Sequence, residues 1–286
     1  MFRLNLKENM EILQGLVNDG DRRLIHKVRK SQYYGGIATV DVVGCYLDCA
    51  FCWVPDYKRS VSSIKNHIDE FDFLSPQETF DILKSIGDKN NFNSVRLSGG
   101  EPTLNSKHLL ETIRLMSKTK YNYILETNGL MLDKKFVSEL SEFKDDIYVY
   151  FSLKGCNSEN FGELTNRDKK YWEKQLDSLE KVIDKDFTVG INIMSNYLTK
   201  KELLFLIEKM RNIHSLIPFA IDLKKTSIFS HVQKRLEERG ITHEKPKVDS
   251  EIYDKILENR YPELYERHNE DIYKIGGMNF FNFNEI

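Results

Sequence analysis

Short apolar runs alternate along this chain with longer stretches in which apolar residues recur at three- and four-residue spacing. The short runs are rich in Val, Ile, Tyr and Phe, a composition typical of strands. They predict six strands, at residues 37–43, 94–98, 121–126, 147–152, 187–194 and 219–223. The longer stretches predict helices at residues 76–86, 107–117, 133–143, 166–183 and 200–213, after a charged, helix-like leader at about 6–31.

Strands that alternate with helices in this way predict an α/β fold with a parallel sheet. Six repeats would make a partial (β/α)6 barrel of the TIM type, which places functional groups at the C-terminal ends of its strands. We expect an N-terminal helical extension at residues 1–34, the barrel core at 35–225, and a C-terminal helical cap at 226–286. The aromatic residues near the end of that cap are expected to dock on the core or over the barrel mouth.

Charge and hydropathy exclude some kinds of partner. The chain has 42 Lys and Arg against 44 Asp and Glu, a formal net charge of −2, so no global field draws it to nucleic acid or to an anionic membrane. No apolar run approaches a membrane span, and the first residues are already charged. The sequence therefore predicts a cytoplasmic protein without a membrane partner, and nucleic acid is a possible but not a favoured partner.

Three of the four cysteines, Cys45, Cys49 and Cys52, lie within eight residues at C-x3-C-x2-C spacing, with no fourth cysteine nearby. Crowded cysteines in an intracellular chain favour metal binding over disulfides. Iron–sulfur clusters are normally held by four thiolates, so three would leave one iron open to a small molecule. The spacing alone is also compatible with zinc, and a closed structural site completed by a histidine is the alternative from another functional class.

Polar and glycine-rich motifs follow the predicted strands. The first is Ser98-Gly99-Gly100-Glu101-Pro102, where two glycines allow the backbone to approach a ligand closely. Strand three ends at Glu126 and Asn128, before Gly129, which permits a left-handed turn. Strand four carries Ser152 and Lys154, which share a face at i and i+2. These motifs predict a polar ligand site along one rim of the sheet.

With this cysteine triplet and these rim motifs, the chain resembles the radical S-adenosylmethionine (radical SAM) enzymes over about residues 35–225. The resemblance implies a [4Fe–4S] cluster on Cys45, Cys49 and Cys52, and S-adenosylmethionine as the second cofactor. In the family, Ser98–Pro102 corresponds to the motif that holds the methionine amino group, and Glu101 adds a complementary charge. The implied cofactor contacts are Ser98, Gly99, Gly100, Glu101, Pro102, Glu126, Asn128, Ser152, Lys154, Asn192 and Phe51.

Two of these contacts have a particular motivation. In the glycyl-radical activases, a polar residue and a lysine at strand four meet the ribose and the methionine carboxylate. This chain has Ser152 where those activases usually show an acid. In strand five, Asn192 follows Gly190, a glycine inside an apolar strand, which suggests a close backbone approach such as an adenine against the sheet.

The resemblance implies reductive cleavage of S-adenosylmethionine to a 5′-deoxyadenosyl radical that abstracts hydrogen from a substrate. Only Cys156 lies outside the triplet, so this chain cannot hold a second cluster on four cysteines, and it resembles single-cluster activases such as the pyruvate formate-lyase activating enzymes. Their substrate is a partner protein, and their reductant is a flavodoxin or a ferredoxin. Small-molecule and tRNA-base enzymes of the deazaguanine or wybutosine type are the alternatives. Cys156 is a candidate catalytic thiol on the substrate side, or a small buried residue.

Overall fold

The computed structural model describes residues 6–243, 248–268, 273–275 and 277–283, which form two compact units. Unit 1 comprises Met1–Asp48, Val54–Thr127 and Met131–Val149, and unit 2 comprises Cys49–Trp53, Asn128–Leu130 and Tyr150–Ile286. The cysteine loop thus contributes Cys45 to unit 1 and both Cys49 and Cys52 to unit 2.

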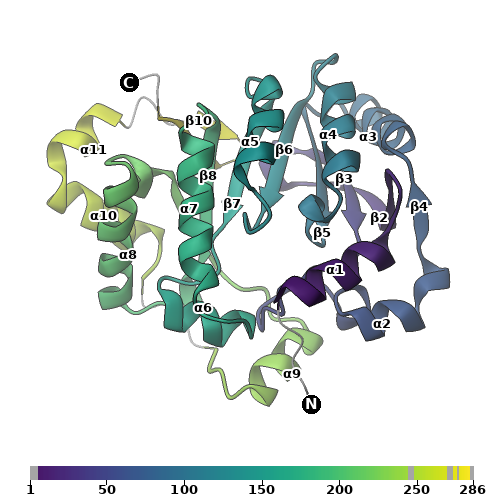
Figure 1. The fold of residues 1–286 in the computed structure, drawn as a ribbon. Helices are drawn as coiled ribbons and strands as arrows, with labels where there is room; N and C mark the ends of the chain where they lie inside the picture. Colours follow the sequence, from purple (N-terminus) through teal and green to yellow (C-terminus); the bar gives the residue numbers. More distant parts are fainter. Residues whose placement is uncertain (1–5, 244–247, 269–272, 276, 284–286) are drawn as a thin grey trace. The chain divides into compact units, whose positions relative to one another are not determined.

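Unit 1 is a β/α unit whose strands run in the order β1-β2-β3-β5-β6 (Figure 1). Strands β3, β5 and β6 are parallel, and the register sets Val42 of β3 beside Gly99 of β5, so the C-terminal ends of these two strands coincide. Helix α3 packs on β2, β3 and β5, and α4 packs on β6. The elements of unit 1 are α1 (Leu6–Val17), β1 (Asn18–Asp19), β2 (Arg22–Ser31), β3 (Ile37–Val42), α2 (Val61–Asn66), β4 (Asp72–Leu74), α3 (Pro76–Asn90), β5 (Ser94–Gly99), α4 (Ser106–Met116), β6 (Asn122–Thr127), α5 (Lys134–Leu140) and the start of β7 (Ile147–Ser152).

Local chemistry explains where these elements begin and end. Helix α3 starts with a capping box, because Ser75 Oγ accepts from the Glu78 amide at 3.2 Å while Glu78 Oε2 accepts from the Ser75 amide at 2.8 Å. Pro76 occupies the first turn, where its missing N–H costs nothing. The helix ends at Asn91, which adopts a left-handed conformation with φ of 54°.

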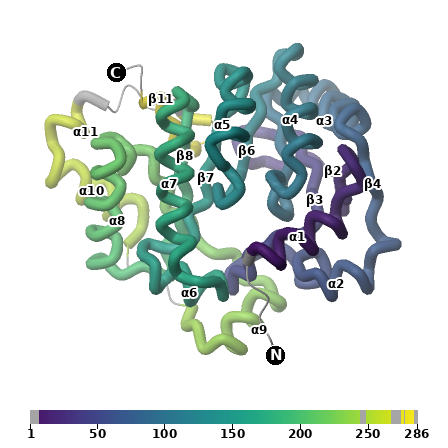
Figure 2. The backbone as a smooth tube through the Cα atoms, in the orientation of Figure 1, coloured from purple at the N-terminus to yellow at the C-terminus, as the bar shows by residue number. Residues whose placement is uncertain are grey.

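Unit 2 continues the β/α alternation around β8 (Figure 2). Strand β8 pairs with β9 in parallel and with β11 antiparallel. Strand β11 in turn pairs with β10, and Leu153 just after β7 donates to the Asn192 carbonyl of β8 at 3.0 Å. The elements of unit 2 are the end of β7, α6 (Ser158–Thr165), α7 (Tyr171–Ile183), β8 (Thr188–Met194), α8 (Lys200–Ile213), β9 (Ile221–Lys224), α9 (Ser230–Glu238), α10 (Ser250–Arg260), α11 (Pro262–His268), β10 (Tyr273–Ile275) and β11 (Met278–Asn282).

The predicted α/β class is confirmed: the sheet is largely parallel and is not closed, as in a partial barrel of the TIM type. All six predicted strands are present, with β9 beginning at Ile221 after a short 3-10 turn. The domain boundaries expected at residues 34 and 225 stay a prediction. In the described part of the chain, none of the helices combines the length and the apolarity that crossing a membrane requires.

The prediction of a helical leader at about 6–31 is only partly correct. Its helix ends at Val17, and residues 22–31 form strand β2, which pairs antiparallel with β3 and with β4. Pairing with β3 supplies hydrogen bonds to this segment that its local charged pattern does not reveal. The helix predicted at 166–183 likewise begins at Tyr171, and a separate helix, α6, precedes it.

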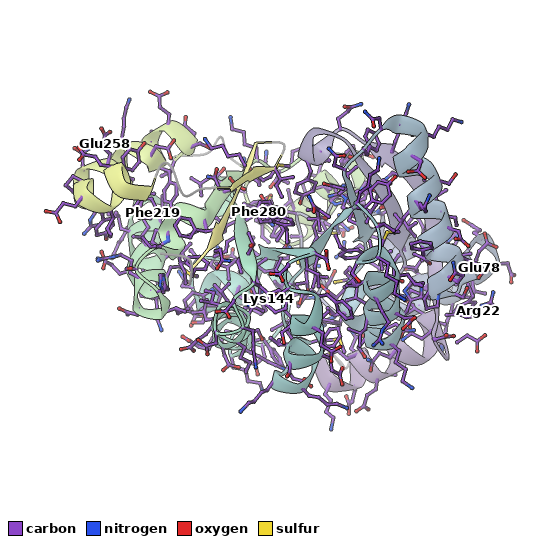
Figure 3. The ribbon with its side chains drawn as sticks, turned by 90° about the horizontal axis from the view of Figure 1, so that it is seen from above. Arg22, Glu78, Lys144, Phe219, Glu258 and Phe280 are labelled. Atoms are coloured by element: carbon purple, nitrogen blue, oxygen red, sulfur yellow. The ribbon has the colours of Figure 1, made fainter. Side chains whose placement is uncertain are left out.

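The C-terminal aromatic segment docks on the core, as one of the two predicted alternatives stated, but as a strand rather than as part of a helical cap. Strand β11 pairs with the first part of β8, aligning Phe281 with Val189. Phe280, labelled in Figure 3, is fully buried, and its ring lies 5.4 Å from that of Tyr150. Residues 244–247, 269–272, 276 and 284–286 of the predicted cap lie outside the described residues.

Candidate functional site

In unit 1, the glycine-rich motif after β5 is built against the start of the cysteine loop. The Gly100 amide donates to the Val42 carbonyl at 2.8 Å, and the Glu101 amide donates to the Gly44 carbonyl at 2.9 Å. A Cβ on Gly100 would lie 2.2 Å from the Gly44 carbonyl oxygen, so only glycine fits. The close backbone approach predicted for a ligand is therefore made, at Gly100, by the loop that carries the cysteines.

Glu101 holds the ends of two strands together. Its side chain is buried, and Oε1 accepts hydrogen bonds from the Thr103 and Thr127 hydroxyls, each at 2.7 Å. Thr127 ends β6, so the carboxylate ties the turn after β5 to the neighbouring strand. Pro102 opens a short 3-10 turn here, where its ring restricts the backbone. The predicted contact of Glu101 with S-adenosylmethionine stays a prediction.

Sequence reasoning missed Arg23, which lies in the charged leader. Arg23 is fully buried, and its guanidinium donates to the carbonyls of Val17 at 3.1 Å, Val43 at 2.6 Å and Glu101 at 3.4 Å. Burial lowers the pKa of Arg23 to about 9, while Glu101 and Cys45 act in the opposite direction, so the guanidinium stays charged at neutral pH. One cation thus joins the end of α1, the cysteine loop and the glycine-rich motif.

Glu126 is also engaged within unit 1. Its carboxylate pairs with Arg96 of β5 and accepts from the Tyr34 hydroxyl at 2.5 Å and from Ser98 Oγ at 3.4 Å. Burial and the neighbouring Glu126 carboxylate raise the pKa of Tyr34 well above its usual value, so Tyr34 remains a donor. The structure brings Ser98 and Glu126 together as predicted, in a network that includes Arg96 and Tyr34, which sequence reasoning did not single out.

In unit 2, the loop segment Cys49–Trp53 is held by neighbouring elements. The Ala50 amide donates to the Leu164 carbonyl of α6 at 2.8 Å. Phe51 is buried and stacks on Tyr197 with ring centroids 5.5 Å apart, and Lys154 Nζ lies 5.8 Å from the Phe51 ring. Phe51 and Lys154, two predicted cofactor contacts, are therefore neighbours.

The predicted rim residues of unit 2 meet around Gln175 of α7, which sequence reasoning missed. Asn192 Nδ2 donates to Ser152 Oγ at 3.1 Å, so the side chains of β7 and β8 are joined as their placement suggested. Gln175 is fully buried; its Nε2 donates to the carbonyls of Asn128 at 2.6 Å and Ser152 at 3.3 Å, and its Oε1 accepts from the Lys154 amide at 3.1 Å. Its position in the apolar stripe of α7 was a signal, since a polar residue there needs buried partners.

Gly190 has a different neighbour from the one expected. A Cβ at this position would lie 2.4 Å from the Asn279 carbonyl oxygen and 2.9 Å from the Tyr150 ring. The glycine correctly indicated a crowded position. The groups that approach it are the C-terminal strand segment and an aromatic side chain, so the expectation of an adenine at Gly190 is corrected. Asn192 remains a predicted cofactor contact.

Cys156 is fully buried between Asn157 and Asn160. Burial raises the pKa of its thiol to about 12, so the thiol is protonated at neutral pH and is not a nucleophile. These features favour the packing alternative, and a role as a hydrogen-atom donor stays a prediction.

The donor chemistry of the cysteine loop fits an iron–sulfur cluster. None of the four cysteines forms a disulfide; Cys49 and Cys156 are buried, and Cys45 and Cys52 are partly exposed. Across the described residues, no three His, Cys, Asp or Glu side chains already converge as a metal site. Cluster binding by Cys45, Cys49 and Cys52 therefore rests on three thiol donors in one short loop whose flanks are fixed by Gly44 and Ala50.

We expect Gln175→Leu to lower the free energy of unfolding by about 2 to 3 kcal/mol, because buried backbone groups of Asn128, Ser152 and Lys154 lose a partner. Urea unfolding measures this change. Ser178→Ala on the same helix is the matched control, since its buried Oγ makes no hydrogen bond to any described residue and its removal should be nearly neutral. Equal stability of the leucine variant and the wild type would contradict the positioning role of Gln175.

Comparison of the chain with known proteins identifies one family. The model of the radical SAM superfamily matches residues 39–210. A probable GTP 3′,8-cyclase of Saccharolobus islandicus is 26% identical over 225 residues, 76% of this chain and 67% of that protein. The S-adenosyl-L-methionine-dependent tRNA 4-demethylwyosine synthase of Methanocaldococcus jannaschii is 23% identical over 245 residues, 74% of this chain and 73% of that one.

Among solved structures, Streptococcus suis SuiB aligns with a TM-score of 0.52 at 19% identity, over 80% of this chain and 45% of SuiB. SuiB bound to its precursor peptide SuiA aligns with a TM-score of 0.53. This chain therefore spans about half the length of SuiB. At this identity the likeness concerns the fold.

Proposed function

Because this chain belongs to the radical SAM superfamily, whose enzymes use a [4Fe–4S] cluster and S-adenosylmethionine, we propose that Cys45, Cys49 and Cys52 hold that cluster. When bound, the two cofactors supply reductive cleavage of the sulfonium to a 5′-deoxyadenosyl radical, which takes a hydrogen atom from a substrate. The reductant is a flavodoxin or a ferredoxin. Membership in a superfamily of enzymes argues against the alternative of a non-catalytic structural metal site.

One observation carries this proposal: the motif that is expected to bind S-adenosylmethionine and the start of the cysteine loop are hydrogen-bonded to each other. The amides of Gly100 and Glu101 donate to carbonyls of Val42 and Gly44, and a side chain at residue 100 would collide with Gly44. A structural zinc loop would not require this contact. A cofactor that touches both the metal and the strand rim needs the two held in a fixed relation, and these hydrogen bonds supply it.

The residues of the chain are assigned roles toward S-adenosylmethionine as follows. In unit 1, the backbone after Ser98 presents carbonyls to the methionine ammonium group, and Glu101 fixes the shape of that turn through Thr103 and Thr127. In unit 2, Lys154 offers a positive charge to the methionine carboxylate, and Ser152 and Asn192 offer polar atoms to the ribose. The buried ring of Phe51 beside Lys154 excludes water.

For the substrate, we propose a single-cluster, activase-like reaction in which hydrogen is taken from a partner protein. The number of cysteines supports this proposal. Beyond the triplet the chain has only Cys156, and one thiolate is too few for a second cluster held by four thiolates of this chain. Two of the five Lys and Arg residues of β2 are engaged within unit 1 and are not available to a phosphate. Arg23 is buried, and Arg29 forms a two-point ion pair with Asp41 at 2.7 and 2.9 Å.

A nucleotide substrate is the second candidate. It is favoured by the names of two relatives, a probable GTP 3′,8-cyclase and a tRNA 4-demethylwyosine synthase, at 26% and 23% identity. Faster 5′-deoxyadenosine formation on addition of GTP or unmodified tRNA would support this candidate over the activase-like one.

The test is anaerobic reconstitution with iron and sulfide, followed by reduction with dithionite in the presence of S-adenosylmethionine. We expect the wild type to form 5′-deoxyadenosine and Cys49→Ala to form none above background, because two thiolates cannot hold the cluster at full occupancy. Cys156→Ala is the matched control, and its product yield should stay close to that of the wild type.

Electron paramagnetic resonance of the reduced protein separates the ways in which this test can fail. A cluster signal that changes on addition of S-adenosylmethionine, without product, would mean that cleavage waits for the substrate. A fully loaded cluster that neither responds to S-adenosylmethionine nor forms the nucleoside would refute the proposed function.

A further inference from the structure

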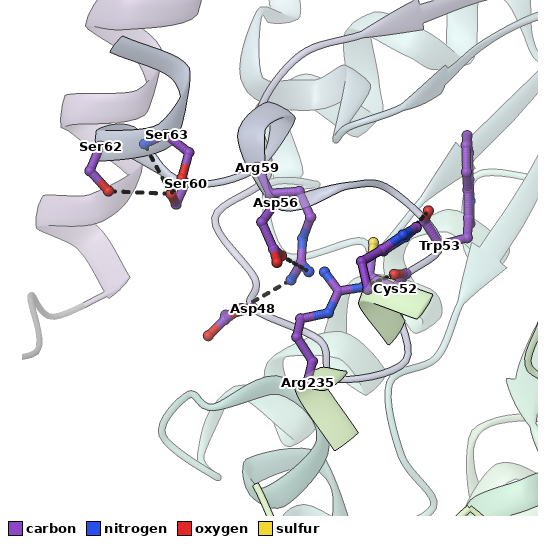
Figure 4. A network of polar contacts seen from close by, with 10 residues as sticks. Asp48, Cys52, Trp53, Asp56, Arg59, Ser60, Ser62, Ser63 and Arg235 are labelled. Carbon is purple, nitrogen blue, oxygen red and sulfur yellow. Dashed lines mark hydrogen bonds and ion pairs between the residues drawn. The ribbon is translucent and has the colours of Figure 1, made fainter. Parts of the chain in front are cut away.

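Helix α9 makes two hydrogen bonds to the backbone of the cysteine loop, and both lie within unit 2. Arg235 Nη2 donates to the carbonyl oxygen of Cys52, the last of the three cysteines (Figure 4). One turn earlier on the same helix, His231 Nε2 lies 2.8 Å from the carbonyl oxygen of Trp53. A carbonyl can only accept, so the proton of His231 is on Nε2 in this contact.

The side chain of Arg235 is placed by packing. Arg235 is only 5% exposed, between Val232 at 0% and Leu236 at 3% on the buried face of α9. Burying a guanidinium is costly unless it is hydrogen-bonded, so its contact with the Cys52 carbonyl offsets part of that cost. His231 is oriented as well, because its ring stacks parallel to that of Phe229 with centroids 5.6 Å apart.

These contacts fix one side of the segment Cys49–Trp53. The other side is fixed by the Ala50 amide, which donates to the Leu164 carbonyl at 2.8 Å, and the Cys52 amide closes the turn on the Cys49 carbonyl at 3.2 Å. Cys52 therefore sits between an internal turn and a buried cation. Hydrogen bonds and charges next to a cluster ligand set both the geometry of a cluster and its reduction potential.

We propose that α9 is a clamp on the cysteine loop, in which Arg235 and His231 are positioning residues that hold Cys52 for the cluster and Arg235 raises the cluster's reduction potential. The inference rests on the proposed function for its second half. The clamp itself is a property of the metal-free chain, in a segment for which sequence analysis predicted only a C-terminal helical cap.

The first test uses metal-free protein and hydrogen exchange of the backbone amides of residues 49–54. We expect Arg235→Gln to exchange about tenfold faster there, the factor that follows from losing one hydrogen bond to a charged donor. Lys234→Gln is the matched control: it removes the same charge from the same helix, at an exposed residue that pairs with Glu238 at 3.8 Å. It should leave the loop protected.

The second test is a redox titration of the reconstituted cluster, followed by electron paramagnetic resonance without S-adenosylmethionine. Arg235→Gln should shift the midpoint potential to a more negative value, Arg235→Lys should restore it, and Lys234→Gln should resemble the wild type. Recovery of the wild-type potential in Arg235→Lys would show that the positive charge sets it, because a purely structural role of the arginine side chain would not be restored by lysine.

The clamp would be overturned if Arg235→Gln kept the amide protection and the midpoint potential of the wild type. It would also be overturned if Lys234→Gln changed both quantities as much as Arg235→Gln does. Should Arg235→Gln fail to fold, His231→Ala removes the second contact at a half-buried residue and must also accelerate exchange at 49–54 if the clamp exists. A wild type that takes up no cluster would refute the proposed function, while exchange in the metal-free protein still decides the clamp. If the wild type forms 5′-deoxyadenosine and Arg235→Gln has unaltered amide exchange and midpoint potential, the clamp is refuted and the proposed function stands.

Discussion

Gly100→Ala is expected to abolish 5′-deoxyadenosine formation and to lower the free energy of unfolding by about 1 to 3 kcal/mol, the usual cost of overpacking a buried site. The added Cβ would lie 2.2 Å from the carbonyl oxygen of Gly44 and 3.0 Å from its carbon and nitrogen. Because all three are backbone atoms, the conflict is relieved only by moving the start of the cysteine loop or the turn after β5. Urea unfolding and the nucleoside assay measure the two effects.

Gly15→Ala separates this collision from a general effect of replacing glycine. Gly15 lies inside helix α1, and a Cβ there would meet nothing within 4 Å. Alanine should therefore stabilise the protein by about 0.5 to 1 kcal/mol through helix propensity and leave product formation unchanged. Wild-type stability and activity of Gly100→Ala would show that the glycine-rich motif does not need its contact with Gly44.

Arg23→Met should be the most destabilising of these substitutions, costing about 3 to 5 kcal/mol, as when one partner of a buried charged contact is removed. The guanidinium is fully buried and donates to the carbonyls of Val17, Val43 and Glu101. Methionine fills part of the volume but leaves these acceptors without their donor. The midpoint of urea unfolding and the iron content after reconstitution measure the loss, and both should fall.

Arg22→Met is the control for Arg23. Arg22 is the preceding residue of the same strand, carries the same charge, and is exposed while donating to the Phe73 carbonyl. We expect a change within about 0.5 kcal/mol, typical of surface positions. If the two variants lost equal stability, the effect would come from the charge of β2 and not from the buried contacts of Arg23.

Both predictions concern how the cysteine loop is anchored, and each unit contributes separately. In unit 1 the loop begins at Gly44, whose carbonyl is held by the Glu101 amide beside the buried Arg23. In unit 2 the segment from Cys49 is held by Leu164 of α6 and by Arg235 of α9. The loop that carries the three proposed cluster ligands is thus fixed by backbone contacts on both sides.

The sequence by itself determined the features that depend on neighbours along the chain. Alternating β-rich and helical periods predicted the α/β fold, because these periods reflect which residues of one element face the core. The spacing of Cys45, Cys49 and Cys52 and the motif Ser98–Pro102 indicated the family, since short motifs keep their chemistry wherever the fold places them. Gly129 was expected at a left-handed turn, and its φ is 79°.

Tertiary structure alone decided which distant residues share a hydrogen bond. The Arg23 guanidinium meets the Glu101 carbonyl across 78 residues, and that of Arg235 meets the Cys52 carbonyl across 183. A basic residue in a charged segment is expected to be solvated, but the fold buries Arg23 and surrounds its guanidinium with carbonyls. Gln175 indicated a buried hydrogen-bond partner and Gly190 indicated a crowded backbone, but the groups that fill these roles come from strands and helices far along the chain. Burial and long-range pairing are properties of the assembled fold, and no local period or motif encodes them.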